Sequence, residues 1–594
     1  MKVSSHKLLV RFYKWRLDAV TDKHFIYIVS VITGLIVGIA AVALKNLAHF
    51  ISYGLHVWSP FGEENYLYFL FPFIGIMLGL LFTKYIIKRN VKHGVPQVLY
   101  SMSMKRGEIA PHNMYSSIVA SALTVGFGGS VGLEGPSIVS GAAYGSNIGR
   151  FFRLNYRQIL LLIGCGSAGV MAAIFNAPIA AVIFVLEVMM LNLSMSSIVP
   201  LLLAASSATL MSYFLMEKDV LFYSVIFQKI GYELVDIPSF IIFGVIAGLV
   251  SVYFKRMYIY IESLFDKIPE QKSKLYIGGA VLGLTLFFFP SLYGEGYNEI
   301  NMSVRGDFSY LFDNSIFNSF RNNFIVLLML LLAVVFMKIV ATCVTFGAGG
   351  VGGIFAPALF IGANLGLFFA VLFLNFDIHV SISVFVLLGM CGMIAGVLHA
   401  PLTGIFLIAE LTGGYNLFVP LMLVSAISFA TVRAFESSSV YTYLLARRKQ
   451  LLTHNKDRSV LTLLNIKKLI EKDFATINVN ANLGELVRLI KVSHRNIFPV
   501  IDDDGVLHGI IKLDDIRDIM FDAKKYNKVD VRTLMHMPKY FFSPEDHMDD
   551  VVKTIQKTQH YNFPILDNGK YVGFISRATV FSEYRKLSAY FSEE

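Results

Sequence analysis

The fold of this chain is decided by the stretch Gly126-Phe-Gly-Gly-Ser-Val-Gly132-Leu-Glu134-Gly-Pro136, which recurs 221 positions later (347 − 126) as Gly347-Ala-Gly-Gly-Val-Gly-Gly353-Ile-Phe355-Ala-Pro357. Both copies read G-x-G-G-x-x-G, then an apolar residue, Glu or Phe, a small residue and proline. Flexible glycine backbone before a new helix, inside apolar sequence, points backbone N–H groups at an ion. The repeat therefore predicts an anion site built from helix ends within a membrane.

The composition is that of a membrane protein. Of the 594 residues, 55% are hydrophobic and only 15% are charged, against about 45–50% apolar residues in soluble domains. A spanning helix needs about 20 apolar residues. Apolar runs of this kind lie near 26–47, 66–86, 159–191, 196–216, 237–254, 275–289, 324–345, 355–375, 381–409 and 417–432.

Positive charge flanks the apolar part of the chain. Because the first apolar run is a full span long and lacks a cleavage-site pattern, we expect it to be retained. Basic flanks predict that both ends are cytoplasmic. We also expect the protein to lie in the plasma (inner) membrane. The net charge of +10 then reflects topology, and no nucleic-acid partner is expected. The basic residues concerned are Lys2, Lys7, Arg11, Lys14, Arg16, Arg447, Arg448 and Lys449.

No metal centre is predicted from the cysteines. Cys165, Cys343 and Cys391 all lie in apolar sequence without the spacing of metal ligands. We expect them to serve in packing.

A second element repeats in almost the same register. The stretch that begins at Ala177-Pro178 and ends at Glu187 matches the stretch from Ala400-Pro401 to Glu410. Two independent elements in one register indicate a duplicated chain, and duplicated halves with broken helices are typical of transporters with a midplane substrate site. The predicted fold is a multi-spanning α-helical membrane protein with two duplicated, and we expect inverted, halves.

The carboxyl-terminal part has the composition of a soluble α/β module. It also repeats, because Ile497-Phe-Pro-Val-Ile-Asp502 recurs as Asn562-Phe-Pro-Ile-Leu-Asp567. Each unit reads as helix, strand, turn, strand and helix, and the tandem resembles a pair of CBS domains. The expected divisions are 1–25 (cytoplasmic segment), 26–450 (transport domain), 451–465 (linker), 466–527 (first CBS domain) and 528–594 (second CBS domain).

The CBS resemblance implies an adenine-nucleotide site whose signature, G-h-h-[S/T]-x-x-[D/N], is incomplete here. The first copy has Lys512 in place of the hydroxyl residue but retains Asp515, and the second retains Ser576 but has Thr579 in place of the acid. We therefore favour a structural module for dimerisation and trafficking, with nucleotide sensing through Asp515 and Ser576 as the alternative. No other cofactor is expected.

Helix ends suit a transported anion better than a lysine does. Removing a small ion from water costs on the order of 20 kcal/mol in the idealised Born picture, so the pathway must replace hydration. A fixed lysine would trap the anion, whereas helix N-termini offer roughly half a charge and free N–H donors. Pro136 and Pro357 fit helix starts. Glu134 has a carboxylate that can occupy the anion position and leave it when protonated.

The repeated motifs resemble those of the CLC chloride channels and transporters. Residues 132–136 resemble the family motif G-[K/R]-E-G-P, and residues 353–357 resemble G-x-F-x-P. The resemblance covers about 25–450 and implies a homodimer with one anion pore per subunit, in which Glu134 is the gate and proton acceptor. It assigns chloride or another small anion to His93, Gly94, the N–H groups of Ile354 and Phe355, and Tyr441. The remaining selectivity-motif residues are Val95, Pro96, Gly132, Leu133, Gly135, Pro136, Gly353, Ala356 and Pro357.

The first selectivity motif departs from its family form. G-S-G-I-P is replaced by Lys92-His93-Gly94-Val95-Pro96, so that the serine hydroxyl is lost. An imidazole can offer an N–H donor and titrates near physiological pH. His93 therefore either coordinates the anion or turns away and leaves the backbone to bind it, which leaves the preferred anion open.

Two further departures bear on mechanism. Leu133 replaces a basic residue near the outer entrance, which predicts weaker anion capture. Val188 stands where proton-coupled members commonly have an acid, while Glu187 and its counterpart Glu410 are better explained as ligands of backbone groups. The sequence therefore favours a passive channel gated by Glu134, with a chloride/proton antiporter as the alternative. A membrane enzyme, or a CBS-bearing sensor without transport, is more remote, since no nucleophile and base occur at a recognisable spacing.

Overall fold

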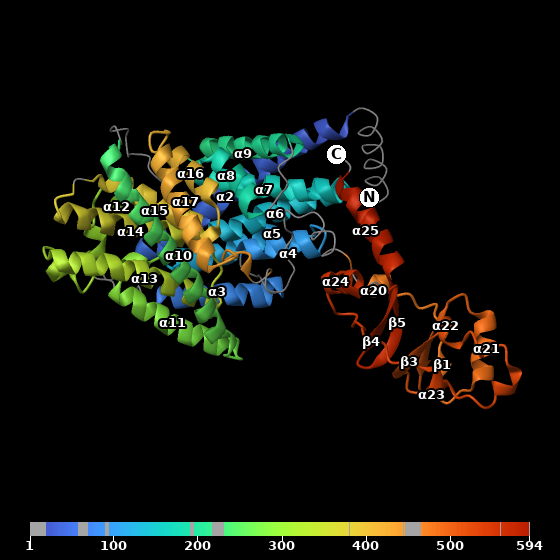
Figure 1. The fold of residues 1–594 in the computed structure, drawn as a ribbon. Coiled ribbons are helices and arrows are strands. Elements are labelled where there is room, and N and C mark those ends of the chain that lie inside the picture. The colour runs from blue at the N-terminus through green and yellow to red at the C-terminus, as the bar shows by residue number, and fades with distance from the viewer. Residues whose placement is uncertain are drawn as a thin grey trace. The chain divides into compact units, whose positions relative to one another are not determined.

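The structure is a computed structural model that describes residues 20–57, 69–89, 94–189, 195–216, 231–378, 380–443, 445, 464, 466–558 and 560–592. The chain divides into two compact units, Met1–Arg448 and Lys449–Glu594. The first is helical and the second mixes strands with helices (Figure 1). Only residue 464 of the expected linker, 451–465, falls among the described residues.

Helices make up the first unit. Within the described residues, seven helices are long and apolar enough to cross a membrane, so this is an integral membrane protein. The helices are α2 (Asp22–Val57), α3 (Phe71–Leu81), α4 (Gly94–Met104), α5 (Asn113–Gly126), α6 (Glu134–Phe151), α7 (Tyr156–Phe175), α8 (Pro178–Val188), α9 (Met195–Leu215), α10 (Ile237–Asp266), α11 (Gln271–Phe288), α12 (Tyr297–Val304), α13 (Phe324–Ala348), α14 (Phe355–Asn375), α15 (Ile382–Leu398), α16 (Pro401–Leu411) and α17 (Phe418–Phe435).

Two of the apolar runs are broken into pairs of helices. Run 159–191 is interrupted at Asn176 (φ 52°) between α7 and α8, and run 381–409 at His399 (φ 57°) between α15 and α16. Each break is followed by a proline at the start of the next helix. Since α8 and α16 have 11 residues each, or about 16 Å of helix, neither spans the roughly 30 Å of a bilayer core. The predicted broken helices are therefore present.

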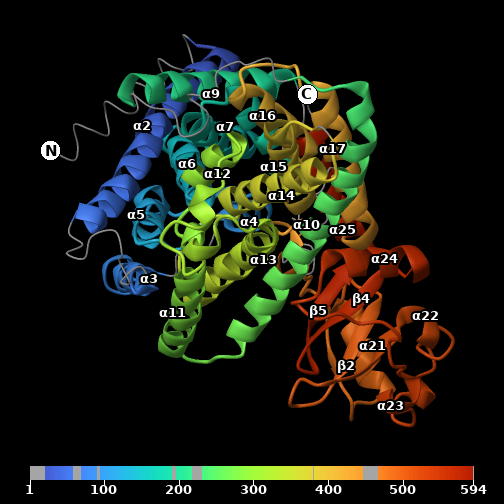
Figure 2. The same cartoon turned by 90° about the vertical axis from the view of Figure 1, so that its left-hand side faces the viewer.

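The two halves pack in the same way. Helix α6 lies along α7 as α14 lies along α15 (Figures 1 and 2), and α2 meets α9 as α10 meets α17. The same close approach joins both pairs. A Cβ atom on Gly141 would lie 2.3 Å from the carbonyl oxygen of Gly166, and one on Gly362 would lie 2.3 Å from that of Gly389. Small residues that let backbones touch are typical of membrane helix pairs.

The second unit contains two similar layered repeats. In the first, β1 (Ile477–Asn478) runs parallel to β2 (Ile497–Ile501), which pairs antiparallel with β3 (Leu507–Lys512); in the second, β4 (Asn562–Asp567) pairs antiparallel with β5 (Lys570–Ser576). Both hairpins carry an irregularity, at Val500/Ile501 and at Ile565/Leu566. Their helices are α20 (Ile466–Leu469), α21 (Leu483–Val492), α22 (Leu513–Ile516), α23 (Val531–Leu534), α24 (Met548–Thr558) and α25 (Arg577–Ser592).

The order of elements confirms the predicted sequence of helix, strand, turn, strand and helix in each repeat. In the second hairpin Asn568 and Gly569 both have positive φ, at 51° and 83°, as a tight two-residue turn requires. Each repeat closes over its own apolar cluster, which contains Phe498 and Val500 in the first and Phe563 and Ile565 in the second.

Candidate functional site

The two copies of the glycine motif pair with each other. The Gly132 N–H donates to the Gly353 carbonyl (2.9 Å), and the Gly353 N–H donates to the Gly132 carbonyl (2.7 Å). The bridge is antiparallel and joins equivalent residues, which is the relation that a two-fold axis between the halves produces. Helix α6 begins at Glu134 and α14 at Phe355, each two residues after the bridge. The N-termini of both helices therefore meet at one point.

Glycine is required where the two copies touch. A Cβ atom on Gly353 would lie 2.6 Å from the Gly135 nitrogen, and one on Gly135 would lie 2.9 Å from the Gly353 Cα. Gly128 and Gly349, which occupy equivalent places in the two copies, have φ of +88° and +103°, values that side chains disfavour. The pattern of glycines therefore follows from a close backbone contact and a sharp turn in each copy.

A third helix begins at the same place. The Cα of Gly135 lies 3.8 Å, and the carbonyl oxygen of Gly352 lies 4.0 Å, from where a Cβ atom on Gly94 would stand. Gly94 has φ of +57° and opens α4, with Val95 buried and Pro96 in its first turn. His93 lies outside the described residues. The partial positive ends of α4, α6 and α14 thus converge, which is a suitable place for an anion.

The carboxylate of Glu134 occupies this place. The residue is fully buried, and its Oε1 accepts a hydrogen bond from the Tyr297 hydroxyl. Its Oε2 lies 2.0 Å from where a Cβ atom on Gly132 would stand, and it has no hydrogen bond of good geometry among the described residues. The backbone N–H groups of Glu134 and Ala356 still interact with the carboxylate electrostatically. The side chain therefore folds back over the bridge, as an anion held between helix ends would lie.

Three of the other residues assigned to the anion, Ile354, Phe355 and Tyr441, lie near this carboxylate. Ile354 and Phe355 are buried at the start of α14, where backbone N–H groups lack acceptors within the helix. Tyr441 is 4% exposed and lies close enough to interact electrostatically with Glu134. Its hydroxyl has no hydrogen-bond partner in the part of the chain that the structure describes. A buried, unsatisfied hydroxyl is costly without a ligand, which suits a donor to a bound anion.

The loop before α12 also contributes to the site and was not predicted from the sequence. Glu295 Oε1 accepts the Leu133 N–H (2.8 Å), and Tyr297, the first residue of α12, binds Glu134. Neither residue belongs to a repeated motif. An acid between two glycines, in the stretch Gly294-Glu-Gly-Tyr297 between apolar segments, was the available signal.

Two lysines within the apolar runs were also missed. Lys338 is fully buried in α13; its Nζ donates to the carbonyls of Gly294 (2.9 Å) and Leu292 (3.3 Å) and lies 4.7 Å from the centre of the Phe360 ring. Lys45 in α2 donates to the carbonyl of Ile174 (2.5 Å). Each is a lone charge in an apolar run, which by itself indicates a functional or structural role in a membrane.

Glu187 and Glu410 each bind backbone N–H groups of the other half of the first unit. Glu187 accepts the N–H groups of Leu402 (2.9 Å) and Thr403 (2.8 Å) at the start of α16. Glu410 accepts those of Ile179 (2.9 Å) and Ala180 (2.7 Å) at the start of α8. Each acid therefore caps the broken helix of the other half, which confirms the predicted binding of backbone groups.

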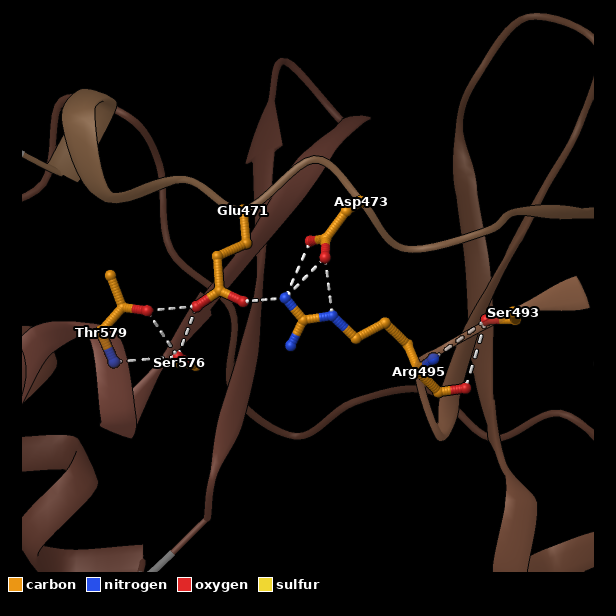
Figure 3. Close-up of polar contacts among 6 residues, drawn as sticks. All are labelled: Glu471, Asp473, Ser493, Arg495, Ser576 and Thr579. Carbon is orange, nitrogen blue, oxygen red and sulfur yellow. Dashed lines mark hydrogen bonds and ion pairs between the residues drawn. The ribbon is translucent and has the colours of Figure 1, made fainter.

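In the second unit, Ser576 is part of a polar cluster (Figure 3). Glu471 Oε1 accepts hydrogen bonds from the hydroxyls of Ser576 and Thr579, while Oε2 pairs with Arg495 Nη2 at 2.7 Å. Arg495 also binds both oxygens of Asp473, and these bonds raise the pKa of its guanidinium. The Ser576 hydroxyl is thus occupied by Glu471, a carboxylate close to Thr579, where the signature expects an acid.

Asp515, the other residue assigned to a nucleotide, has different partners. It accepts the Lys512 N–H (3.2 Å) and lies 3.5 Å from His536 Nδ1. The contacts given above for Asp515 and Ser576 are thus made with other residues of the second unit. Among the described residues no cluster of metal ligands was found.

Comparison with families of known proteins finds both units. The family model described as "Voltage gated chloride channel" matches residues 74–433, and the CBS domain model matches residues 466–522 and 531–586. Two curated relatives are the "Putative chloride channel protein ClcB-like" of Ralstonia nicotianae (27% identical, 64% of this chain and 86% of that protein) and the "H(+)/Cl(-) exchange transporter ClcA" of Vibrio cholerae (26% identical, 70% and 88%).

Solved structures share the fold. A slow cyanobacterial Cl-/H+ antiporter matches with a TM-score of 0.60 at 24% identity, over 72% of this chain and 99% of its own. A eukaryotic CLC transporter matches with a TM-score of 0.58 at 17% identity, over 93% of this chain and 98% of its own. At these identities the similarity establishes the fold alone, and the activity has to be inferred from the site.

Proposed function

Because the chain belongs to the voltage-gated chloride channel family, whose model matches residues 74–433, we propose that it exchanges chloride for protons across a membrane. Anion transport is the activity of this family. The observation that carries the proposal is the Glu134 carboxylate, buried between the helix starts at the Gly132–Gly353 bridge. The sequence favoured a passive channel, whereas the exchange transporter among the relatives supports the antiporter alternative.

The geometry gives a physical basis for exchange. An ionised Glu134 occupies the point where an anion would lie, so the carboxylate and a permeant anion compete for the same helix ends. Protonation removes the charge and the attraction, so that the side chain leaves and the anion can enter. Because one position then holds either the carboxylate or the anion, proton binding and anion binding become linked.

Val188 stands where proton-coupled members of the family commonly have an acid. Its neighbour Glu187 accepts hydrogen bonds from backbone N–H groups at the start of α16. We therefore expect Glu187→Gln to retain proton coupling. Its free energy of unfolding should fall by about 1–3 kcal/mol, because the hydrogen bonds to a charged carboxylate are weakened. The ratio of chloride to proton flux in liposomes checks this, with Glu410→Gln as the matched control. Loss of proton flux in Glu187→Gln alone, with chloride flux retained, would make Glu187 a proton relay.

Substitution of His93 tests which anion the site prefers. If its side chain contacts the ion, His93→Ser restores the family hydroxyl and should shift the preference toward chloride over larger anions by about two- to tenfold, the effect of one hydrogen bond. Relative permeabilities from liposome flux with several anions provide the measurement. Identical permeabilities before and after the change would show that the backbone at Gly94 binds the ion without the side chain.

The remaining expectations belong to the same proposal. We expect a homodimer with one pathway per subunit, both termini in the cytoplasm, and the plasma (inner) membrane as its location. The bound anion is the expected ligand, and the occupied Ser576 hydroxyl favours a structural role for the CBS pair over nucleotide sensing. The relatives are transporters, which argues against the enzyme alternative.

The direct test is simultaneous recording of chloride and protons from liposomes that contain the purified protein. An outward chloride gradient should drive chloride out and protons in, at a fixed ratio. Chloride flux without proton movement would favour the channel, and no flux of either ion would favour a sensor without transport.

A further inference from the structure

We propose that Tyr297 is a latch that holds the ionised Glu134 gate closed, and that it is presented by a loop built for this purpose. The inference rests on the proposed function, since it assigns a role within the same site. The Tyr297 hydroxyl donates a hydrogen bond to Glu134 Oε1, and both residues are buried. No other hydrogen bond to Oε1 is found among the described residues.

The latch loop, residues 290–297, is anchored to the first copy of the glycine motif. The Ser130 hydroxyl donates to the Leu292 carbonyl (2.7 Å), and the Gly294 N–H donates to the Gly128 carbonyl (3.2 Å). From the other side, the Lys338 ammonium donates to the carbonyl of Gly294 at 2.9 Å. A buried ammonium is retained only when it is satisfied, and here the loop carbonyls satisfy it.

The same loop fixes the helix that carries the gate. Glu295 Oε1 accepts the Leu133 N–H (2.8 Å), immediately before the start of α6. Gly296 has φ of +89°, and a Cβ atom there would lie 2.4 Å from the Phe360 ring. The loop can therefore turn here only through glycine, which brings Tyr297 back toward Glu134. The latch loop thus binds both the start of α6 and the Glu134 carboxylate.

Other titratable groups face Glu134 from separate elements. Lys45 of α2, Glu295 of the latch loop and Tyr441 beyond α17 all interact with it electrostatically. Lys45 donates to the carbonyl of Ile174, and the Tyr441 hydroxyl makes no hydrogen bond to a described residue. The backbone N–H groups of Glu134 and Ala356 also act on the carboxylate. Among the side chains that the structure describes, the hydrogen bond to the ionised, inward carboxylate comes from Tyr297.

The chemistry sets the sign of the effect. A hydroxyl that donates to a carboxylate stabilises its ionised form, so removing the hydroxyl should allow protons to open the gate at higher pH. Tyr297→Phe keeps the ring, whose centre lies 6.3 Å from that of Phe175, and removes only the donor. The pH of half-maximal chloride flux should rise by about one to two units, the range expected for a hydrogen bond to a charged group.

The test compares the pH profile of chloride efflux from liposomes for four proteins. These are the wild type, Tyr297→Phe, Glu134→Gln and the double variant. Tyr310→Phe is the matched control, because it removes a buried hydroxyl that binds Asn364 and Ser303 instead of the gate. We expect the profile to move in Tyr297→Phe, to stay in place in Tyr310→Phe, and to be the same in Glu134→Gln with or without the tyrosine change.

The latch is overturned if the pH profile of Tyr297→Phe matches that of the wild type. It is also overturned if adding Tyr297→Phe changes the flux of Glu134→Gln as much as it changes the flux of the wild type. Size-exclusion chromatography reports whether Tyr297→Phe is folded. If it is not, Ser130→Ala loosens the loop at Leu292 without touching the gate, and the latch predicts a smaller shift in the same direction. Failure of the wild type to transport chloride would instead contradict the proposed function.

Discussion

Glu134→Gln is expected to separate chloride movement from proton movement. Glutamine has nearly the same shape as glutamate but carries no charge, so it cannot compete with an anion for the ends of α6 and α14. It also cannot accept the transported proton. Chloride flux should therefore persist and lose its pH dependence, while proton flux should fall by about a hundredfold or more, the scale of a lost proton-transfer group.

Paired chloride and pH electrodes on the same liposome suspension give both rates for Glu134→Gln. Glu108→Gln serves as the control, because Glu108 is an exposed acid of the same half of the chain and its loss should change neither rate. The role of Glu134 as gate would be refuted by a Glu134→Gln protein whose chloride flux follows the same pH profile as the wild type.

Gly353→Ala is expected to abolish transport by pushing the two motif copies apart. The new Cβ atom would lie 2.6 Å from the Gly135 nitrogen, and a backbone atom cannot give way as a flexible side chain can. The bridge between Gly132 and Gly353 should break, and the helix ends should no longer face one ion. Overpacking of this kind costs about 1–3 kcal/mol in stability, while the loss of anion binding should be nearly complete.

Isothermal titration with chloride and liposome efflux measure binding and transport in Gly353→Ala. Gly54→Ala is the matched control, since nothing lies within 4 Å of where its Cβ atom would stand. Normal chloride binding in folded Gly353→Ala protein would mean that the close approach of the two copies is not needed for the site.

Much of the transport unit could be predicted from local signals. Glycines before Glu134 and Phe355 mark helix starts, and the shared register of two elements marks the duplication. Pro178 and Pro401 mark the broken helices because proline cannot continue a helix that precedes it. The hairpin turns of the second unit were equally local. All of these features except the duplication depend on backbone chemistry within a few residues.

What the sequence did not predict depends on contacts between distant segments. Tyr297 is 163 positions from Glu134 and belongs to no repeat, so only the folded chain brings the hydroxyl to the carboxylate. Glu187 and Glu410 were expected to bind backbone groups, but their exchange across the halves follows from three-dimensional symmetry. Lys338 was visible as a lone charge in an apolar run, yet its partners are carbonyls, which no side-chain pattern reveals.

The reversal potential of the reconstituted protein under a pH gradient tests chloride/proton exchange most directly. With equal chloride on both sides of a planar bilayer, exchange predicts a reversal potential that shifts away from zero when the pH differs, and that returns to zero in Glu134→Gln. A reversal potential that stays at the chloride equilibrium value at every pH gradient would contradict the account and establish a passive channel.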